Sequence, residues 1–151
     1  MMKLNDFMDI EDIKLNLTST NKQDVIKELA NRMYKKGQIN NLDLLIKDVL
    51  KREALDTTGI GLKIALPHAK TPYIDKPSVV FGRSEEGINF DSLDGERAHL
   101  FFLICIPEDG VNLHLKVLAM LSRSLIHESF RNELLNANNE NEVMEILKKV
   151  E

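Results

Sequence analysis

The residues of this chain best suited to chemistry lie in one short stretch that ends in Pro67-His68. An apolar segment, Ile64 to Leu66, leads to this histidine, and a loop of hydroxyls and glycines, Asp56 to Gly61, precedes the segment. An imidazole accepts and releases a group near neutral pH because its unperturbed pKa is about 6.5. Hydroxyls and unhindered glycine N–H groups suit an oxyanion or a phosphoryl group. A hairpin turn followed by a buried histidine is an equally good interpretation of this stretch alone.

A second histidine, His114, falls in the first turn of a predicted amphipathic helix. Apolar residues between Val117 and Leu125 follow it at helical spacing, so its side chain should face the sheet. A helix N-terminus favours an anion, and an imidazole there could donate a hydrogen bond to it. A hydrogen-bonded core histidine is the other interpretation. His99, at the start of the most apolar segment, is expected to be structural, and His127 is expected to lie on the surface.

Arg52 and the loop before His68 are weaker candidates. Arg52 is expected near the C-terminal end of a helix, where a cation interacts favourably with the helix dipole. Its planar guanidinium would also suit the charge on a phosphoryl group. The candidate phosphoryl-binding residues of the loop are ordinary turn formers, singled out by their closeness to His68: Thr57, Thr58, Gly59 and Gly61.

Other kinds of reactive site are poorly supported. No two histidines have the close spacing of a zinc site, so no metal is expected. The single cysteine, Cys105, lies within an apolar run and lacks the exposed, electropositive setting that activates a thiol. No Gly-x-Ser-x-Gly elbow of a serine hydrolase occurs. Histidine acting as the nucleophile is the remaining possibility.

The composition is that of one globular domain, expected to span residues 1–151, with 43% hydrophobic and 29% charged residues. A net charge of −4 argues against a nucleic-acid partner. No apolar run is long enough to cross a membrane, so direct insertion is not expected. One cysteine, without a partner for an internal disulfide, suits a reducing compartment. We therefore expect a cytoplasmic protein.

The elements that must position the histidines follow from the hydrophobic periodicity. Residues 13–17 alternate and predict a first strand. Thr20 and Gln23 form a capping-box pattern that predicts a helix ending at Gly37, and a second helix is expected from about Asn41. Strands are predicted at 64–66, 79–82 and 100–106, and helices at 111–125, 128–136 and 141–150. The 100–106 run is apolar on both faces and should be a central strand. This order predicts an α/β three-layer sandwich, with a mixed β-sheet between helical layers.

Two blocks of the chain resemble a known family. Lys51 to Gly61 and Ile64 to Lys70 resemble the active-site signature of enzyme IIA domains of the phosphoenolpyruvate-dependent sugar phosphotransferase system. The class is the fructose/mannitol one, which also includes a nitrogen-regulatory form. His114 to Ser122 resembles the second block of that family, and Gly87 to Gly95 resembles its fructose branch. The similarity extends from about Leu4 to Val150.

The resemblance implies a phosphotransferase in which His68 accepts the phosphoryl group. His114 matches the second active-site histidine of the family, and Arg52 matches the arginine of the preceding helix end. The implied donor is the small phosphocarrier protein HPr, and the implied acceptor is a IIB domain that serves a membrane-embedded IIC sugar permease. No cofactor is implied, since the phosphoryl group comes from phosphoenolpyruvate through enzyme I and HPr.

Two other functions remain open at this stage. A regulatory protein would use the same phosphorylatable His68 to control its binding to other proteins. A structural domain would keep His68 and His114 merely as core residues. A carrier also needs an apolar docking surface near His68, and Leu62, Ile64 and Leu66 either contribute to that surface or belong to the sheet core.

Overall fold

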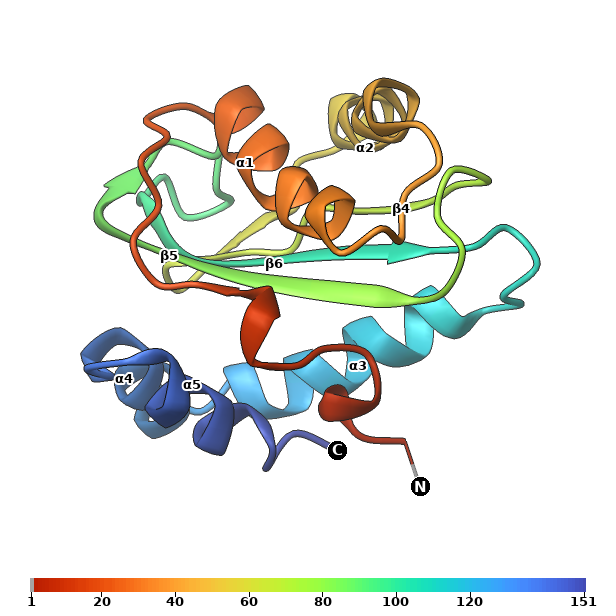
Figure 1. Cartoon of the computed structure of the whole chain (residues 1–151). Coiled ribbons are helices and arrows are strands. Elements are labelled where there is room, and N and C mark those ends of the chain that lie inside the picture. Colours follow the sequence, from red (N-terminus) through yellow and green to blue (C-terminus); the bar gives the residue numbers. More distant parts are fainter. Residues whose placement is uncertain (1) are drawn as a thin grey trace.

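A mixed β-sheet lies between two layers of helices in the computed structural model, which describes residues 2–151 (Figure 1). One face is covered by α1 (Lys22–Lys35) and α2 (Leu42–Leu55). The other is covered by α3 (Leu113–Leu125), α4 (Glu128–Asn136) and α5 (Glu140–Leu147). The short 3-10 helices η1 (Leu4–Asp6) and η2 (Ile10–Asp12) come before the first strand. The predicted α/β three-layer sandwich is confirmed.

The sheet has six strands, and its centre is a long antiparallel pair. The strands are β1 (Ile13–Lys14), β2 (Gly59–Gly61), β3 (Ile64–Ala65), β4 (His68–Lys70), β5 (Ser78–Ile88) and β6 (Ala98–Ile106). Their order is β1-β5-β6-β3-β2, and β4 also pairs with β6. β1 runs parallel to β5, and β3 and β4 run parallel to β6, whereas the β5–β6 and β2–β3 pairs are antiparallel, so the sheet is mixed as predicted.

The apolar side chains of β6 divide between two cores, one on each side of the sheet. Phe102 and Ile104 belong to the core beneath α3, α4 and α5, whereas Phe101 and Leu103 belong to the core beneath α1 and α2. Successive side chains of a strand point to opposite faces, so a strand covered on both sides must be apolar throughout. The prediction of a central strand from the 100–106 run is confirmed.

Several boundaries differ from those predicted. Asn21, rather than Thr20, caps α1, because the Asn21 side chain accepts a hydrogen bond from Asp24 N. Regular pairing of the first strand stops at Lys14, although Leu17 N still donates to Arg83 O at 3.0 Å. The predicted strand at 79–82 is the middle of the longer β5. β2 and β4 were not predicted, because three residues carry no readable periodicity and their pairing depends on the rest of the sheet.

The described residues contain no helix that is long and apolar enough to cross a membrane.

Candidate functional site

His68 is the first residue of β4, and Pro67 is the reason that the strand begins there. Proline has no N–H to give to a sheet and interrupts the pairing after β3. The chain then rejoins β6, with Ile104 N donating to Pro67 O at 3.0 Å and His68 paired with Ile104. Paired residues of neighbouring strands point to the same face. His68 therefore points to the face of the sheet that α3 covers, together with Lys70.

One hydrogen bond decides which nitrogen of His68 is reactive. The Nδ1 atom lies 2.9 Å from the Leu66 carbonyl oxygen. A carbonyl oxygen only accepts, so Nδ1 must carry the proton and the lone pair of the neutral ring is on Nε2. This contact orients the ring and leaves Nε2 as its nucleophilic atom.

His68 lies in a cavity of about 390 Å³ that charged side chains surround. It is lined by residues of α2, of β4, of the segment between β6 and α3, and of α3 itself: Asp48, Lys51, Arg52, Leu55, His68, Ala69, Lys70, Glu108 and His114. Three of these are permanent cations and two are carboxylates. The cavity thus brings together His68, His114 and Arg52. In the chain, Arg52 lies 16 residues before His68 and His114 lies 46 residues after it.

The environment favours the neutral form of His68. Burial is the main cause that lowers its pKa below the usual value, and the charges of Arg52 and His114 act in the same direction. The hydrogen bond to Leu66 and the carboxylate of Glu53 oppose this effect without reversing it. A neutral imidazole keeps the Nε2 lone pair available for attack on an electrophile.

His114 is the second residue of α3 and lines the same cavity. It comes from the helical layer opposite to the one that contains α2 and Arg52. Burial and then the charge of Lys70 lower its pKa. Among the described residues, none forms a hydrogen bond with its buried Nδ1 atom. Asn112, in the N-cap position, has a left-handed backbone and gives the helix no side-chain cap. Both the imidazole and the first turn of α3 therefore keep hydrogen-bonding capacity for an anion.

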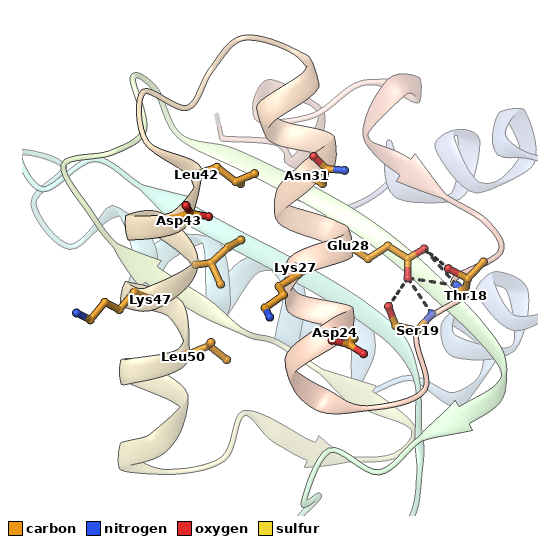
Figure 2. A pocket seen from close by; sticks show the side chains of 11 residues that line it. Thr18, Ser19, Asp24, Lys27, Glu28, Asn31, Leu42, Asp43, Lys47 and Leu50 are labelled. Carbon is orange, nitrogen blue, oxygen red and sulfur yellow. Dashed lines mark hydrogen bonds between the residues drawn. The ribbon is translucent and has the colours of Figure 1, made fainter.

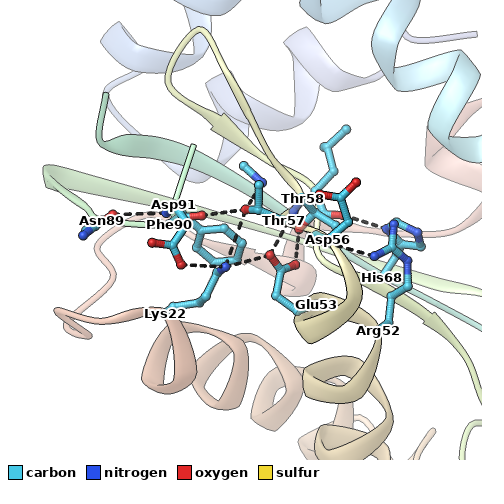
Figure 3. Close-up of polar contacts among 12 residues, drawn as sticks. Lys22, Arg52, Glu53, Asp56, Thr57, Thr58, His68, Asn89, Phe90 and Asp91 are labelled. Atoms are coloured by element: carbon cyan, nitrogen blue, oxygen red, sulfur yellow. Dashed lines mark hydrogen bonds and ion pairs between the residues drawn. The ribbon is translucent and has the colours of Figure 1, made fainter. Parts of the chain in front are cut away.

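Arg52 lies in the last turn of α2, which ends beside the cavity. One guanidinium nitrogen donates to Asp56 O at 3.1 Å (Figure 3). This bond satisfies a carbonyl at the helix end and orients the guanidinium, whose other N–H groups remain for an anion.

The four predicted loop residues do not line this cavity, and their polar groups bond elsewhere (Figure 3). Thr57 Oγ1 donates to Phe90 O at 2.8 Å and accepts from Gly59 N at 3.1 Å. Thr58 donates both its N–H and its hydroxyl to Glu53. Gly61 has a positive φ of 95° and pairs within the β2–β3 hairpin. These residues support the turn, and direct binding of a phosphoryl group by Thr57, Thr58, Gly59 and Gly61 stays a prediction.

Sequence reasoning missed several residues of the cavity, although spacing could have found them. Lys70 follows His68 by two residues, the period that returns a strand to the same face. Asp48 and Leu55 lie four residues before and three residues after Arg52, on one face of α2. The helical and strand periods, counted outward from the two candidate residues, would have identified these neighbours.

The remaining histidines and the cysteine lie outside the cavity. His99 Nδ1 contacts Ser84 O at 2.9 Å, and His127 is exposed at the start of α4. Cys105 is fully buried in β6, and burial raises the pKa of its thiol to about 12. The thiol is therefore neutral and shielded, as expected from its place in an apolar run.

The apolar surface near His68 differs from the one considered from the sequence. Ile64 and Leu66 are buried in the core beneath α3, α4 and α5. Leu62 is exposed, but it lines another cavity, together with Arg131 and Asp94. The side chains of Ile64 and Leu66 both point into this core, so they do not contribute to a docking surface. Among the residues that line the His68 cavity, the exposed large apolar side chain is that of Leu55, which is 81% exposed.

A larger cavity of about 890 Å³ lies between α1 and α2 (Figure 2). Burial opposes the ionisation of Glu28 there, but hydrogen bonds from Ser19 and Thr18 outweigh it and lower the pKa of Glu28. Ser19 Oγ donates to Glu28 at 2.6 Å. Glu28 thus holds the 18–19 segment against α1, and none of the residues lining this cavity is a histidine or a cysteine. Its size does not make it the better candidate site.

Comparisons with known proteins identify the family and the fold. The chain is 40% identical over 146 residues to the "PTS system fructose-specific EIIABC component" of Bacillus subtilis, covering 97% of this chain and 23% of that protein. It is 40% identical over 141 residues to the "PTS system fructose-specific EIIA component" of Haloferax volcanii, covering 93% and 92%. The chain thus spans under a quarter of the first relative and nearly all of the second.

Solved structures share the fold over most of their length. The nitrogen regulatory protein IIA-Ntr of Neisseria meningitidis superposes with a TM-score of 0.87 at 25% identity, covering 94% of this chain and 97% of that one. The mannitol IIA enzyme of Escherichia coli, in its complex with phosphorylated IIB, gives 0.79 at 26% identity, covering 93% and 96%. The family model "Phosphoenolpyruvate-dependent sugar phosphotransferase system, EIIA 2" matches residues 6–150. The chain therefore belongs to the EIIA 2 family of the phosphoenolpyruvate-dependent sugar phosphotransferase system.

Proposed function

We propose that this protein accepts a phosphoryl group from phospho-HPr on Nε2 of His68 and passes it to a IIB domain for sugar uptake. The observation that carries the proposal is the position of His68, which has Nδ1 bound to Leu66 O and lines a cavity shared with His114 and Arg52. Fructose is the favoured sugar class, because two relatives at 40% identity are described as fructose-specific.

The transfer is a displacement at phosphorus between two imidazoles. The Nε2 lone pair of His68 forms a new N–P bond while the N–P bond of the donor breaks and its electron pair returns to the donor nitrogen. The proton on Nδ1 stays in its hydrogen bond to Leu66 O. A loose transition state of this kind needs alignment and charge stabilisation, which Arg52, Lys70 and His114 supply around the phosphoryl oxygens. No metal takes part in this scheme.

The downstream steps are supported by relatives. A mannitol IIA with the same fold has been solved in complex with phosphorylated IIB, which supports a IIB domain as the acceptor. The Bacillus subtilis relative is described as an EIIABC component, which supports a IIC permease as the final destination. Leu55, exposed at the edge of the cavity, gives a partner an apolar contact beside the reacting nitrogen.

Intact mass measurement tests the acceptor step. The protein is incubated with phosphoenolpyruvate, enzyme I and HPr and weighed before and after acid treatment. We expect the mass of one phosphoryl group, lost in acid because phosphoramidates are acid-labile, and no gain in His68→Ala. His127→Ala is the matched control, since it removes an exposed imidazole outside the cavity. Phosphorylation of His68→Ala, or no gain in the unmodified protein, would refute the proposal.

A regulatory role is the second candidate function. The similarity to IIA-Ntr of Neisseria meningitidis, with a TM-score of 0.87, favours it. In that case His68 would still be phosphorylated, but the output would be binding of another protein. The two functions separate in one assay: phosphorylated protein is mixed with a IIB domain of the fructose class, and onward transfer is followed. Rapid transfer supports the carrier, whereas stable phosphoprotein with phosphorylation-dependent binding of another protein supports the regulator.

A further inference from the structure

A buried ion pair is formed by Lys22 and by Glu53, which lies next to Arg52 in the chain (Figure 3). Glu53 Oε2 lies 2.9 Å from Lys22 Nζ, and the Glu53 side chain is only 4% exposed. The same carboxylate accepts the Thr58 N–H at 2.8 Å and the Thr58 hydroxyl. A carboxylate is costly to bury unless it is paired and hydrogen-bonded, and apolar residues of similar size often fill such a site at no loss of stability. Stability alone therefore does not account for Glu53.

The pair joins segments that are far apart in the sequence. Lys22 is the first residue of α1, and Glu53 follows Arg52 in the last turn of α2. Lys22 also contacts Asp91 at 3.2 Å, and its ammonium lies 4.8 Å from the centre of the Phe90 ring. The end of α2, which carries Arg52, is thus held to α1 and to the 90–91 turn at one point.

From Glu53 a chain of hydrogen bonds leads directly to the reactive imidazole. Glu53 holds Thr58 by its N–H and hydroxyl, and the Thr58 carbonyl accepts Leu66 N–H at 3.0 Å. The Leu66 carbonyl in turn accepts the Nδ1 proton of His68 at 2.9 Å. Each bond restrains the peptide that makes the next one. The orientation of the Leu66 carbonyl, and with it the tautomer of His68, is linked in this way to Glu53.

We infer that Lys22 and Glu53 are positioning residues for the transfer reaction: they hold Thr58 so that Leu66 keeps the proton of His68 on Nδ1 and the lone pair on Nε2. This inference rests on the proposed function for its kinetic consequence. Without the carboxylate, Thr58 and the Leu66 peptide lose their anchor, and the ring of His68 gains access to the tautomer with the proton on Nε2. That tautomer cannot attack phosphorus through Nε2.

The chain offers a matched control in a second buried ion pair. Asp12 is 3% exposed and lies 2.9 Å from Lys36 Nζ, so its burial and pairing resemble those of Glu53. It contacts Asp9 N and Lys36, and none of its hydrogen bonds leads to His68. Asp12→Ala and Glu53→Ala therefore remove comparable buried carboxylates, of which only one is connected to the imidazole.

The test combines nitrogen-15 NMR of the histidine rings with the rate of phosphoryl acceptance. In Glu53→Ala we expect the His68 ring signals to shift from a pure Nδ1–H tautomer to a mixture, and acceptance to slow on the order of tenfold, because small misplacements of reacting groups are costly. In Asp12→Ala we expect wild-type tautomer and rate, even where unfolding shows a similar loss of stability. Glu53→Gln keeps the shape of the side chain and should change both readouts in the same direction by a smaller amount.

Each outcome decides the inference. Wild-type tautomer and rate in both Glu53 variants, or equal changes in Asp12→Ala, would overturn it. If Glu53→Ala does not fold, the comparison of Glu53→Gln with Asp12→Asn decides on the same two readouts. The tautomer measurement needs no phosphoryl donor. If the wild-type protein accepts no phosphoryl group, the proposed function fails, but a tautomer shift confined to the Glu53 variants would still support the positioning role.

Discussion

At the residue scale, neighbouring residues orient His68, and the proposed roles of His114 and Arg52 concern the phosphoryl group that His68 accepts. All three line one cavity, but only His68 has one ring nitrogen held by the backbone and the other available for attack. We therefore expect His114→Ala to accept the phosphoryl group and to pass it on poorly. Arg52→Ala should slow transfer by about tenfold to a hundredfold, as expected for a lost charge-stabilising donor, with little change of fold.

Quenched-flow transfer from phospho-HPr and onward to a IIB domain measures both steps. Arg52→Lys keeps the charge but loses the planar fork, so it should fall between Arg52→Ala and the wild type. Wild-type rates in both Arg52 variants would remove Arg52 from the machinery. Unchanged onward transfer in His114→Ala would do the same for His114.

The lowered pKa of His68 also predicts how stability depends on pH. In the unfolded chain His68 takes up its proton near a pKa of about 6.5, whereas in the folded protein, where the pKa is lower, it stays neutral. Between these two values the unfolded state binds more protons, so stability falls as the pH drops through this window. His114 contributes in the same direction.

Urea unfolding at pH 7.5 and pH 5 should therefore show a smaller loss in His68→Gln than in the wild type, because glutamine has no proton to take up. An equal loss in both proteins would contradict the pKa shift.

At the element scale, the β2–β3 hairpin is positioned by its close packing against the 90–92 turn. A Cβ at Gly59 would lie 2.8 Å from Phe90 O and 2.8 Å from Ser92 Oγ, so β2 packs against the 90–92 turn with no room for a side chain. We expect Gly59→Ala to cost about 1–3 kcal/mol, the usual range for overpacking. It should also slow acceptance, because Thr58 moves with Gly59.

Gly37→Ala is the control for this prediction. Gly37 has a positive φ of 75°, but a Cβ there meets nothing within 4 Å. It should cost about 1 kcal/mol through backbone strain alone and leave acceptance unchanged. Denaturant unfolding and the acceptance assay measure both variants. A smaller cost for Gly59→Ala than for Gly37→Ala would mean that the hairpin moves freely.

At the scale of the whole molecule, one sheet joins two cores. The ring centres of Phe81 and Phe102 lie 5.0 Å apart, with the rings tilted by 56°, on the side of α3. Those of Phe90 and Phe101 lie 5.7 Å apart on the side of α1. Because β6 contributes neighbouring side chains to both cores, we expect them to unfold together. Phe102→Ala should lower stability by about 3–5 kcal/mol.

Of the two tyrosines, Tyr73 packs against the opposite core and Tyr34 lies in α1, which covers the same face, so tyrosine fluorescence reports on the side that Phe102 does not contact. In Phe102→Ala we expect the tyrosine transition to shift together with the loss of circular dichroism. Phe101→Ala is the matched variant on the other face of the same strand. Two separate transitions in either variant would show that the layers unfold independently.

Much of the fold was readable from local patterns. α2 and α4 begin and end close to the predicted residues, because each has a clear apolar period and polar residues at its ends. β6 was recognisable from its unbroken apolar run. β2 and β4 were not, since three-residue strands exist only through partners elsewhere in the chain. The cap of α1 moved by one residue because both Thr20 and Asn21 can cap a helix.

The sequence by itself determined the residue types available for chemistry and the layered α/β fold, because periodicity and short motifs are local properties, and its resemblance to a known family singled out His68, His114 and Arg52 among the candidates. The tertiary structure alone decided which nitrogen of His68 is free, because the Leu66 carbonyl that holds Nδ1 is oriented by a turn and a sheet. It also placed Lys22 beside Glu53, 31 residues apart in the chain. Contacts between distant segments depend on packing, which no spacing within one segment reveals.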